Sequence, residues 1–203
     1  MLTAFPYSIG GAVPGALTFI GVSLLVCLCL ISPMRERGFL IHRPLLLSIT
    51  GVTALALTLR YGITLVAVQG ILLFFILTYA SCSDLTSHTM DDFLWVMVAI
   101  LGLVSATRVG IPSMLIGAGM VFVPQLLIAL LPPHKALGGA DIKLSTALAF
   151  LLGWQRGLAA LMLGLLLAVA VMLIVQKVNK KKKKQPFALI PFLSIGAMMM
   201  FFI

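Results

Sequence analysis

Residues 63–92 read ITLVAVQGILLFFILTYASCSDLTSHTMDD, and this stretch decides which class of protein the chain belongs to. The sequence up to Ala80 is almost entirely apolar, as in a membrane-spanning helix. It then runs directly into Asp84, with Asp91 and Asp92 close behind. A carboxylate at the membrane boundary loses solvation unless something compensates, so ionisable residues there mark functional sites.

The composition of the whole chain agrees with this stretch. The chain has 203 residues, of which 62% are hydrophobic and 9% are charged. Soluble domains are about 45–50% apolar and about 25% charged, which excludes that class. We expect an all-α, polytopic membrane protein with about eight transmembrane helices, or seven in the alternative count. No segment outside the membrane is long enough to bury a core, so residues 1–203 should form one domain.

Eight apolar segments can be traced along the chain, and two of them are short for a full span. They are Gly11–Ile31, Pro44–Leu59, Ile63–Ala80, Phe93–Thr107, Ile111–Leu131, Ile142–Trp154, Gly157–Gln176 and Phe187–Ile203. The short ones are the fourth and the sixth, which we expect to begin inside the acidic loops or to lie in a thinned or water-filled region.

The net charge of +9 predicts the orientation of the chain rather than a nucleic-acid partner. Lys and Arg collect in cytoplasmic loops, and here they gather in residues 32–43 and 177–184. With both loops inside and the spans alternating, only Arg60, Arg108 and Arg156 fall outside. We therefore expect a multi-pass protein of the inner or plasma membrane, with its N-terminus outside and the lipid bilayer as a partner.

This orientation also places the acidic residues. The loops Ser81–Asp92 and Pro132–Asp141 both fall in the cytoplasm, although only Lys and Arg were used to orient the chain. Asp84 and Asp141 should therefore lie on one face and form a composite site. Two aspartates held together are the minimum equipment for aspartic proteolysis.

Two local patterns carry these aspartates. In residues 83–92 (SDLTSHTMDD) an aspartate follows an apolar span, and further acids stand where the next span begins. In residues 137–144 (LGGADIKL) Gly138 and Gly139 should form a turn with unusual backbone dihedrals that comes close to an extended substrate. Taken singly, Asp92 and Asp141 also suit ordinary helix starts. The cysteines have neither zinc-site nor disulfide spacing, so we expect no metal and no cofactor.

The paired patterns resemble the type IV prepilin peptidases, membrane aspartic proteases of the GxGD class. Their first motif is an aspartate followed eight residues on by Asp or Asn, here Asp84 and Asp92. Their second is Gly-x-Gly-Asp followed by Lys-Leu, here residues 138–144. The segment Pro186–Leu193 is similar to the family's Pro-Phe-x-x-x-Pro-Phe-Leu sequence. The resemblance runs from residue 44 to the end, after an N-terminal helix and a short cytoplasmic loop in residues 1–43.

The resemblance implies a six-helix peptidase core that removes basic leader peptides from prepilin or pseudopilin precursors for type IV pilus assembly or protein secretion. It implies that Asp84 and Asp141 are catalytic, one as general base and the other as general acid. The residues expected to bind substrate or support the motifs are Asp91, Asp92, Gly138, Gly139, Ala140 and Lys143. Asp84 follows a helix end and Asp141 opens a helix beside Lys143, so helix dipoles should leave the shared proton on Asp84.

Three departures from the family pattern stand out. Ala140 replaces the second Gly of the motif, and Asp91 takes the usual Pro position. The loop Ser32–Arg43 is short and has no cysteine, whereas larger bacterial members carry there an insertion with two Cys-x-x-Cys pairs that is linked to N-methylation. The chain therefore looks like a short form that lacks this insertion.

Two alternative functions remain open from the sequence. Membrane-embedded acids also relay protons or cations in transporters. The presenilin-like branch of proteases shares the Gly-Asp motif, but it sets a Tyr before its first aspartate, where this chain has Ser83.

Overall fold

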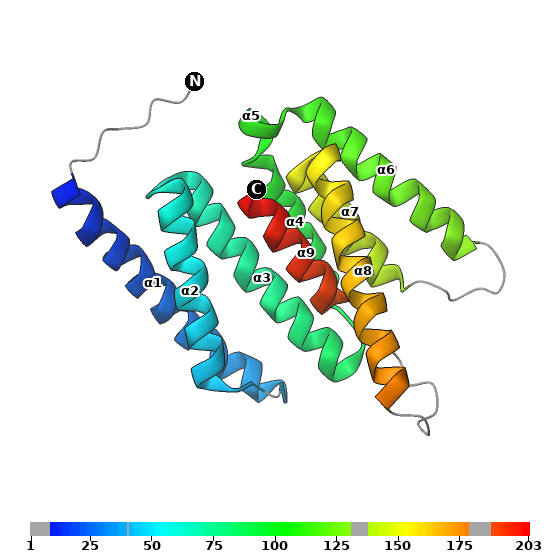
Figure 1. Cartoon of the computed structure of the whole chain (residues 1–203), viewed down its shortest axis with the longest axis horizontal. Helices are drawn as coiled ribbons and strands as arrows, with labels where there is room; N and C mark the ends of the chain where they lie inside the picture. Colours follow the sequence, from blue (N-terminus) through cyan, green and yellow to red (C-terminus); the bar gives the residue numbers. More distant parts are fainter. Residues whose placement is uncertain (1–8, 40, 131–137, 179–187) are drawn as a thin grey trace. The chain divides into compact units, whose positions relative to one another are not determined.

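The computed structural model describes residues 9–39, 41–130, 138–178 and 188–203, and in these ranges the regular structure is entirely helical (Figure 1). The helices are α1 (Ile9–Glu36), α2 (Arg43–Tyr61), α3 (Leu65–Ser87), α4 (Phe93–Leu103), α5 (Ala106–Val109), α6 (Ile111–Leu130), α7 (Gly139–Leu152), α8 (Trp154–Val178) and α9 (Ile190–Phe202). The all-α prediction is confirmed, and each predicted apolar segment contains a helix. The lysine run 180–184 and most of the loop before Gly138 lie outside the described residues.

Five helices are long and apolar enough to cross a membrane, namely α1, α2, α3, α6 and α8. This confirms a multi-pass membrane protein by helix length and composition. By contrast, α4, α7 and α9 have 11, 14 and 13 residues. At about 1.5 Å per residue they span roughly 16–21 Å, less than the hydrocarbon core of about 30 Å. The two segments expected to be short are thus α4 with α5, and α7.

The helices divide into two compact units, Met1–Phe75 and Ile76–Ile203, with the boundary inside α3. In the N-terminal unit α1 packs against α2, and the Thr50 hydroxyl donates a buried hydrogen bond to the Cys27 sulfur at 3.3 Å. The C-terminal unit contains the end of α3 and helices α4–α9. The expectation of one domain across residues 1–203 stays a prediction.

Helix α7 forms the core of the C-terminal unit, and α4, α6, α8 and α9 all pack against it (Figure 1). Its buried residues lie on most sides of the helix: Ile142, Leu144, Ser145, Ala147, Leu148, Ala149, Leu151 and Leu152. One buried polar contact joins it to α6, where the Ser145 hydroxyl donates to Gln125 Oε1 at 2.7 Å. The helix that carries Asp141 is therefore enclosed by its neighbours along most of its length.

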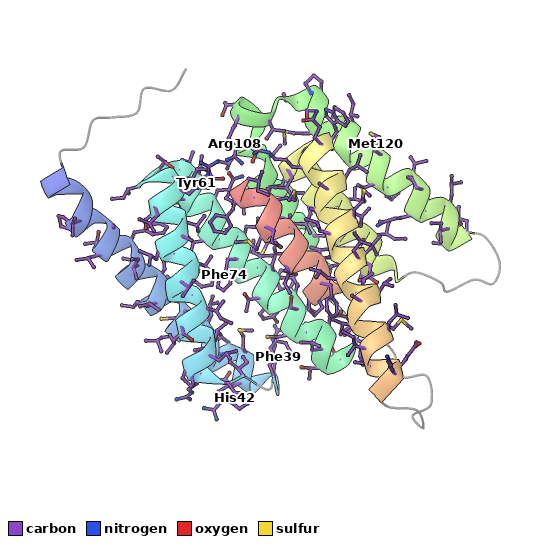
Figure 2. All side chains as sticks on the ribbon, viewed as in Figure 1. Phe39, His42, Tyr61, Phe74, Arg108 and Met120 are labelled. Carbon is purple, nitrogen blue, oxygen red and sulfur yellow. The ribbon has the colours of Figure 1, made fainter. Side chains whose placement is uncertain are left out.

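The outer faces of the long helices are apolar. Met120 on α6 is 45% exposed and projects outward in Figure 2, and Leu166 on α8 is 63% exposed. Exposed apolar side chains on a spanning helix match a lipid environment, where no hydrophobic force drives helices together. Association must then come from close packing and polar contacts between helices.

Glycines supply that close packing in the C-terminal unit. A Cβ at Gly196 of α9 would collide with the Ala160 backbone oxygen of α8 and lie 2.9 Å from the Gly164 nitrogen. A Cβ at Gly117 of α6 would lie 2.8 Å from the Gly153 carbonyl carbon between α7 and α8. Small residues at such contacts let helix backbones approach closely.

This packing predicts opposite effects for two Gly→Ala changes. Gly196→Ala should lower the free energy of unfolding by about 1–3 kcal/mol, because the new methyl group meets backbone atoms that cannot move aside easily. Gly119→Ala, where no atom lies within 4 Å of the new Cβ, should be neutral or raise stability by up to about 1 kcal/mol. Unfolding of the purified variants in detergent measures both. Equal stability of the two variants would contradict the packing argument.

Candidate active site

Asp84 lies in the last turn of α3 and not in a loop, which corrects the expectation that the helix ends near Ala80. The helix continues through this serine-rich stretch, in which the hydroxyls donate to carbonyls one turn back: Ser81 to Leu77 at 2.7 Å and Ser87 to Ser83 at 2.8 Å. These bonds satisfy the polar side chains without breaking the helix. The Asp84 side chain is consequently buried, with 8% of the residue exposed.

The Asp84 carboxyl group is held by the start of α9. The backbone N–H of Ile190, the first residue of α9, donates to Asp84 Oδ2 at 3.1 Å in a buried contact. The first N–H groups of a helix have no partner within the helix, so Asp84 caps α9 from another helix. A second contact lies nearby, where the hydroxyl oxygens of Ser81 and Ser194 are 3.1 Å apart. Together the two contacts fix α9 against the end of α3.

The turn after α3 is bound back onto the helix. His88 adopts the left-handed conformation, with φ of 51°, and its N–H donates to the Asp84 backbone oxygen at 3.0 Å. The Ser83 hydroxyl donates to the Thr89 backbone oxygen at 2.8 Å. A non-glycine residue keeps a positive φ only where the surrounding contacts hold it there. These bonds provide such contacts, and they define where the following acids lie.

Asp91 and Asp92 make different contacts. Asp91 Oδ2 accepts a hydrogen bond from the Tyr79 hydroxyl at 3.4 Å. Asp92 stands at the N-cap position of α4 but makes no side-chain capping bond, so the structure does not support the alternative in which it is an ordinary helix cap. Instead Lys143 Nζ lies 2.6 Å from Asp92 Oδ1. The hydrogen bond and the positive charge from Lys143 lower the pKa of Asp92.

Asp141 lies in the first turn of α7, three residues after the N-cap Gly138. Its carboxylate accepts a hydrogen bond from the Gly138 backbone N–H, the reciprocal half of a capping box. Gly138 has φ of −70° and ψ of 138°, and Gly139 and Ala140 are helical, so the expected unusual dihedrals are absent here. What Gly138 provides is space, because a Cβ on it would lie 2.9 Å from Asp141 Oδ2.

The two motif aspartates are close enough to interact by charge. Burial first, and then the negative charge of Asp84, raise the pKa of Asp141 from 3.8 to about 6, against the hydrogen bond from Gly138. The expectation that Asp141 ionises readily beside Lys143 is therefore wrong, because Lys143 pairs with Asp92 and burial outweighs the helix dipole. Helices α3 and α7 thus bring Asp84 and Asp141 into one site. Within the described ranges, no three His, Cys, Asp or Glu side chains gather as metal ligands.

Comparison with known proteins gives one match. The model of the type IV leader peptidase family matches residues 71–174, which is half of the chain. The chain belongs to the type IV leader peptidase family. The matched region contains both Asp84 and Asp141, and membership makes this protein a membrane protease. No curated protein and no solved structure matches the chain.

Two groups at this site were not identified from the sequence. The Ile190 backbone N–H has no side-chain signature, although the Pro186–Leu193 segment resembling the family's C-terminal motif pointed to its neighbourhood. The Tyr79 hydroxyl lies in an apolar segment, where a tyrosine resembles any other aromatic residue. The Ile190 N–H binds Asp84, which is 106 residues away in the sequence, and the Tyr79 hydroxyl binds Asp91, which is 12 residues away.

The geometry around Asp141 predicts a difference between the two motif glycines. Gly138→Ala should lower peptidase activity on a leader-bearing precursor by about tenfold or more, because the methyl group displaces the carboxyl group that it would crowd. Gly139→Ala places its methyl group in open space and should change activity by less than about twofold. Initial cleavage rates of the two variants test this difference, and their thermal stabilities show whether each variant is folded. Equal activities of the two variants would refute the role given to Gly138.

Proposed function

We propose that this leader peptidase is a membrane aspartic endopeptidase that removes the basic leader from type IV prepilin-like precursors at the cytoplasmic face. The observation that carries the proposal is the charge interaction between Asp84 and Asp141, from helices distant in sequence, within the part of the chain that matches the family. Aspartic proteolysis needs two carboxyl groups that share one proton.

The raised pKa of Asp141 supports one assignment of roles to the two carboxyl groups. Asp141, whose pKa is about 6, holds the shared proton and polarises the scissile carbonyl as general acid. Asp84 is then ionised and takes a proton from water, whose oxygen attacks the carbonyl carbon while Asp141 protonates the carbonyl oxygen. In the second step Asp84 gives the proton it took from water to the amide nitrogen, Asp141 takes a proton back from a hydroxyl of the tetrahedral intermediate, and the C–N bond breaks. This reverses the assignment expected from helix dipoles alone.

The proposed substrates are prepilin or pseudopilin precursors, which join a short basic leader to a long apolar helix. An apolar substrate helix suits the exposed apolar faces of this protein, and the short helices α4 and α7 start at the acidic site. The distribution of Lys and Arg supports a site facing the cytoplasm of the inner or plasma membrane, with the N-terminus outside. The proposal therefore places the protein in type IV pilus assembly or a related secretion system.

Purified protein in detergent should cleave a prepilin-like precursor, and Asp84→Asn and Asp141→Asn should each lower kcat/KM by about a thousandfold or more. The double variant should be no worse than either single variant, because the two groups act as a unit. Asparagine is preferred to alanine because its carbonyl oxygen can still accept the Ile190 N–H. Mass spectrometry of the products gives the cleaved bond.

Glu36→Gln is the matched control, since it makes the same chemical change at an exposed carboxylate outside the site. In membrane vesicles, cleavage of added precursor should occur in inside-out vesicles and not in right-side-out ones. Wild-type protein that cleaves no precursor, or either Asn variant that keeps full activity, would reject the proposal. Proton or cation flux in reconstituted vesicles that depends on Asp84 would favour a transporter instead.

The pH dependence follows from the proton on Asp141. With a pKa of about 6, the singly protonated pair persists below that pH and loses its proton above it. We therefore expect kcat/KM to fall as the pH rises through about 6, approaching tenfold per pH unit on the alkaline side. Rates measured between about pH 4.5 and 8 test this. A rate that rises through the same range would make Asp141 the base.

A further inference from the structure

We infer that the ion pair between Asp92 and Lys143 is a positioning device that sets the separation of Asp84 and Asp141. Its catalytic consequence rests on the proposed function, but its geometry does not. The two residues are 51 positions apart in the sequence and belong to the two different motifs. We place them as positioning residues because the role inferred for them is to hold the helices that carry the two aspartates.

The first argument is that the Asp92 carboxylate makes this contact instead of capping the backbone of its own helix. Asp92 occupies the N-cap position of α4, where an aspartate ordinarily accepts N–H groups of its own helix. It makes no such bond here, and Lys143 Nζ lies 2.6 Å from its Oδ1. The carboxylate therefore connects the start of α4 to the first turns of α7.

The second argument comes from the packing of α4 beside α7. The ion pair joins the two helices near their N-termini. Near their C-termini, Gly102 of α4 lies against α7, where a Cβ would be 2.9 Å from Phe150 Cδ1 and 3.3 Å from Leu151 Cα. The two helices consequently run parallel with contacts at both ends. The glycine contact fixes the far end, and the ion pair fixes the end that carries Asp141.

The third argument is that Asp92 is also connected to the helix carrying Asp84. The turn before Asp92 is bound to α3 by the Ser83–Thr89 and Tyr79–Asp91 hydrogen bonds. A continuous series of polar contacts therefore runs from the end of α3, through this turn and the ion pair, to the start of α7. A change at the ion pair moves one catalytic helix relative to the other.

Lys143 acts through helix position rather than through its charge on Asp141. Residues two apart on an α-helix point about 200° apart around its axis, so Lys143 and Asp141 lie on different faces of α7. The side chains of Asp92 and Lys143 are 75% and 46% exposed. Exposed ion pairs add little to global stability, so loss of this one should change the alignment of the site while the protein stays folded.

A charge swap tests the inference. Asp92→Lys and Lys143→Asp should each lower kcat for precursor cleavage by about five- to tenfold with little change in KM, because like charges now push the helices apart. The double variant restores an opposite pair and should recover most of kcat. Glu36→Lys and Lys177→Asp make the same charge changes at exposed sites on other helices and should leave kcat unaltered.

A direct substrate role for Asp92 gives a different pattern. If Asp92 binds the basic leader, Asp92→Lys raises KM, Lys143→Asp leaves kcat intact, and the double variant is not rescued. That result overturns the inference. So does a double variant whose kcat is no better than the product of the two single effects.

A second measurement does not depend on cleavage. In a background with Cys27, Cys29 and Cys82 replaced by Ser, the pair Asp84→Cys and Asp141→Cys reports the separation of the two positions through its rate of oxidative disulfide formation. Lys143→Asp should slow this rate by about fivefold or more and the charge swap should restore it. Equal rates in all backgrounds reject the positioning role. A wild-type protein that cleaves no precursor rejects the proposed function alone.

Discussion

A carboxyl group enclosed by apolar helices needs hydrogen-bond donors, and this requirement organises the site. Both motif aspartates find their donors at the start of a helix. The Ile190 N–H at the start of α9 binds Asp84, and the Gly138 N–H before α7 binds Asp141. Helix N-termini are the natural source, because their first N–H groups lack partners in the helix and carry partial positive charge. The need of each acid for donors and the need of each helix start for acceptors are therefore met together.

The short helices make this pairing possible. Because α7 and α9 are shorter than the hydrocarbon core is thick, their N-termini can lie at the depth of the last turn of α3. Glycine contacts keep them there: Gly196 joins α9 to α8, and Gly117 joins α6 to the end of α7. In a lipid environment such close contacts replace the hydrophobic force that packs a soluble core.

The aspartates of the two motifs differ in pKa and in hydrogen-bond partners because their surroundings differ. Burial and the neighbouring Asp84 raise the pKa of Asp141, whereas Asp92, exposed and beside Lys143, has a lowered pKa. Asp91 accepts a bond from Tyr79. The two motifs thus combine a buried Asp84 and a half-buried Asp141 with an exposed ion pair near the N-termini of α4 and α7. Identical side chains acquire different chemistry because solvation and charge differ over a few residues.

The sequence by itself determined the protein class, the helical segments and the two motif aspartates, since apolar length and rare acids are local signals. It also pointed to a family, which the match to residues 71–174 established. The tertiary structure decided how the acids are used. The pairing of Lys143 with Asp92 and the bond from Ile190 to Asp84 join residues 51 and 106 positions apart in the sequence. A helix dipole can be inferred from the sequence, but burial cannot, and burial is the larger influence on Asp141. For that reason the local argument predicted that Asp141 ionises readily, whereas its pKa is raised.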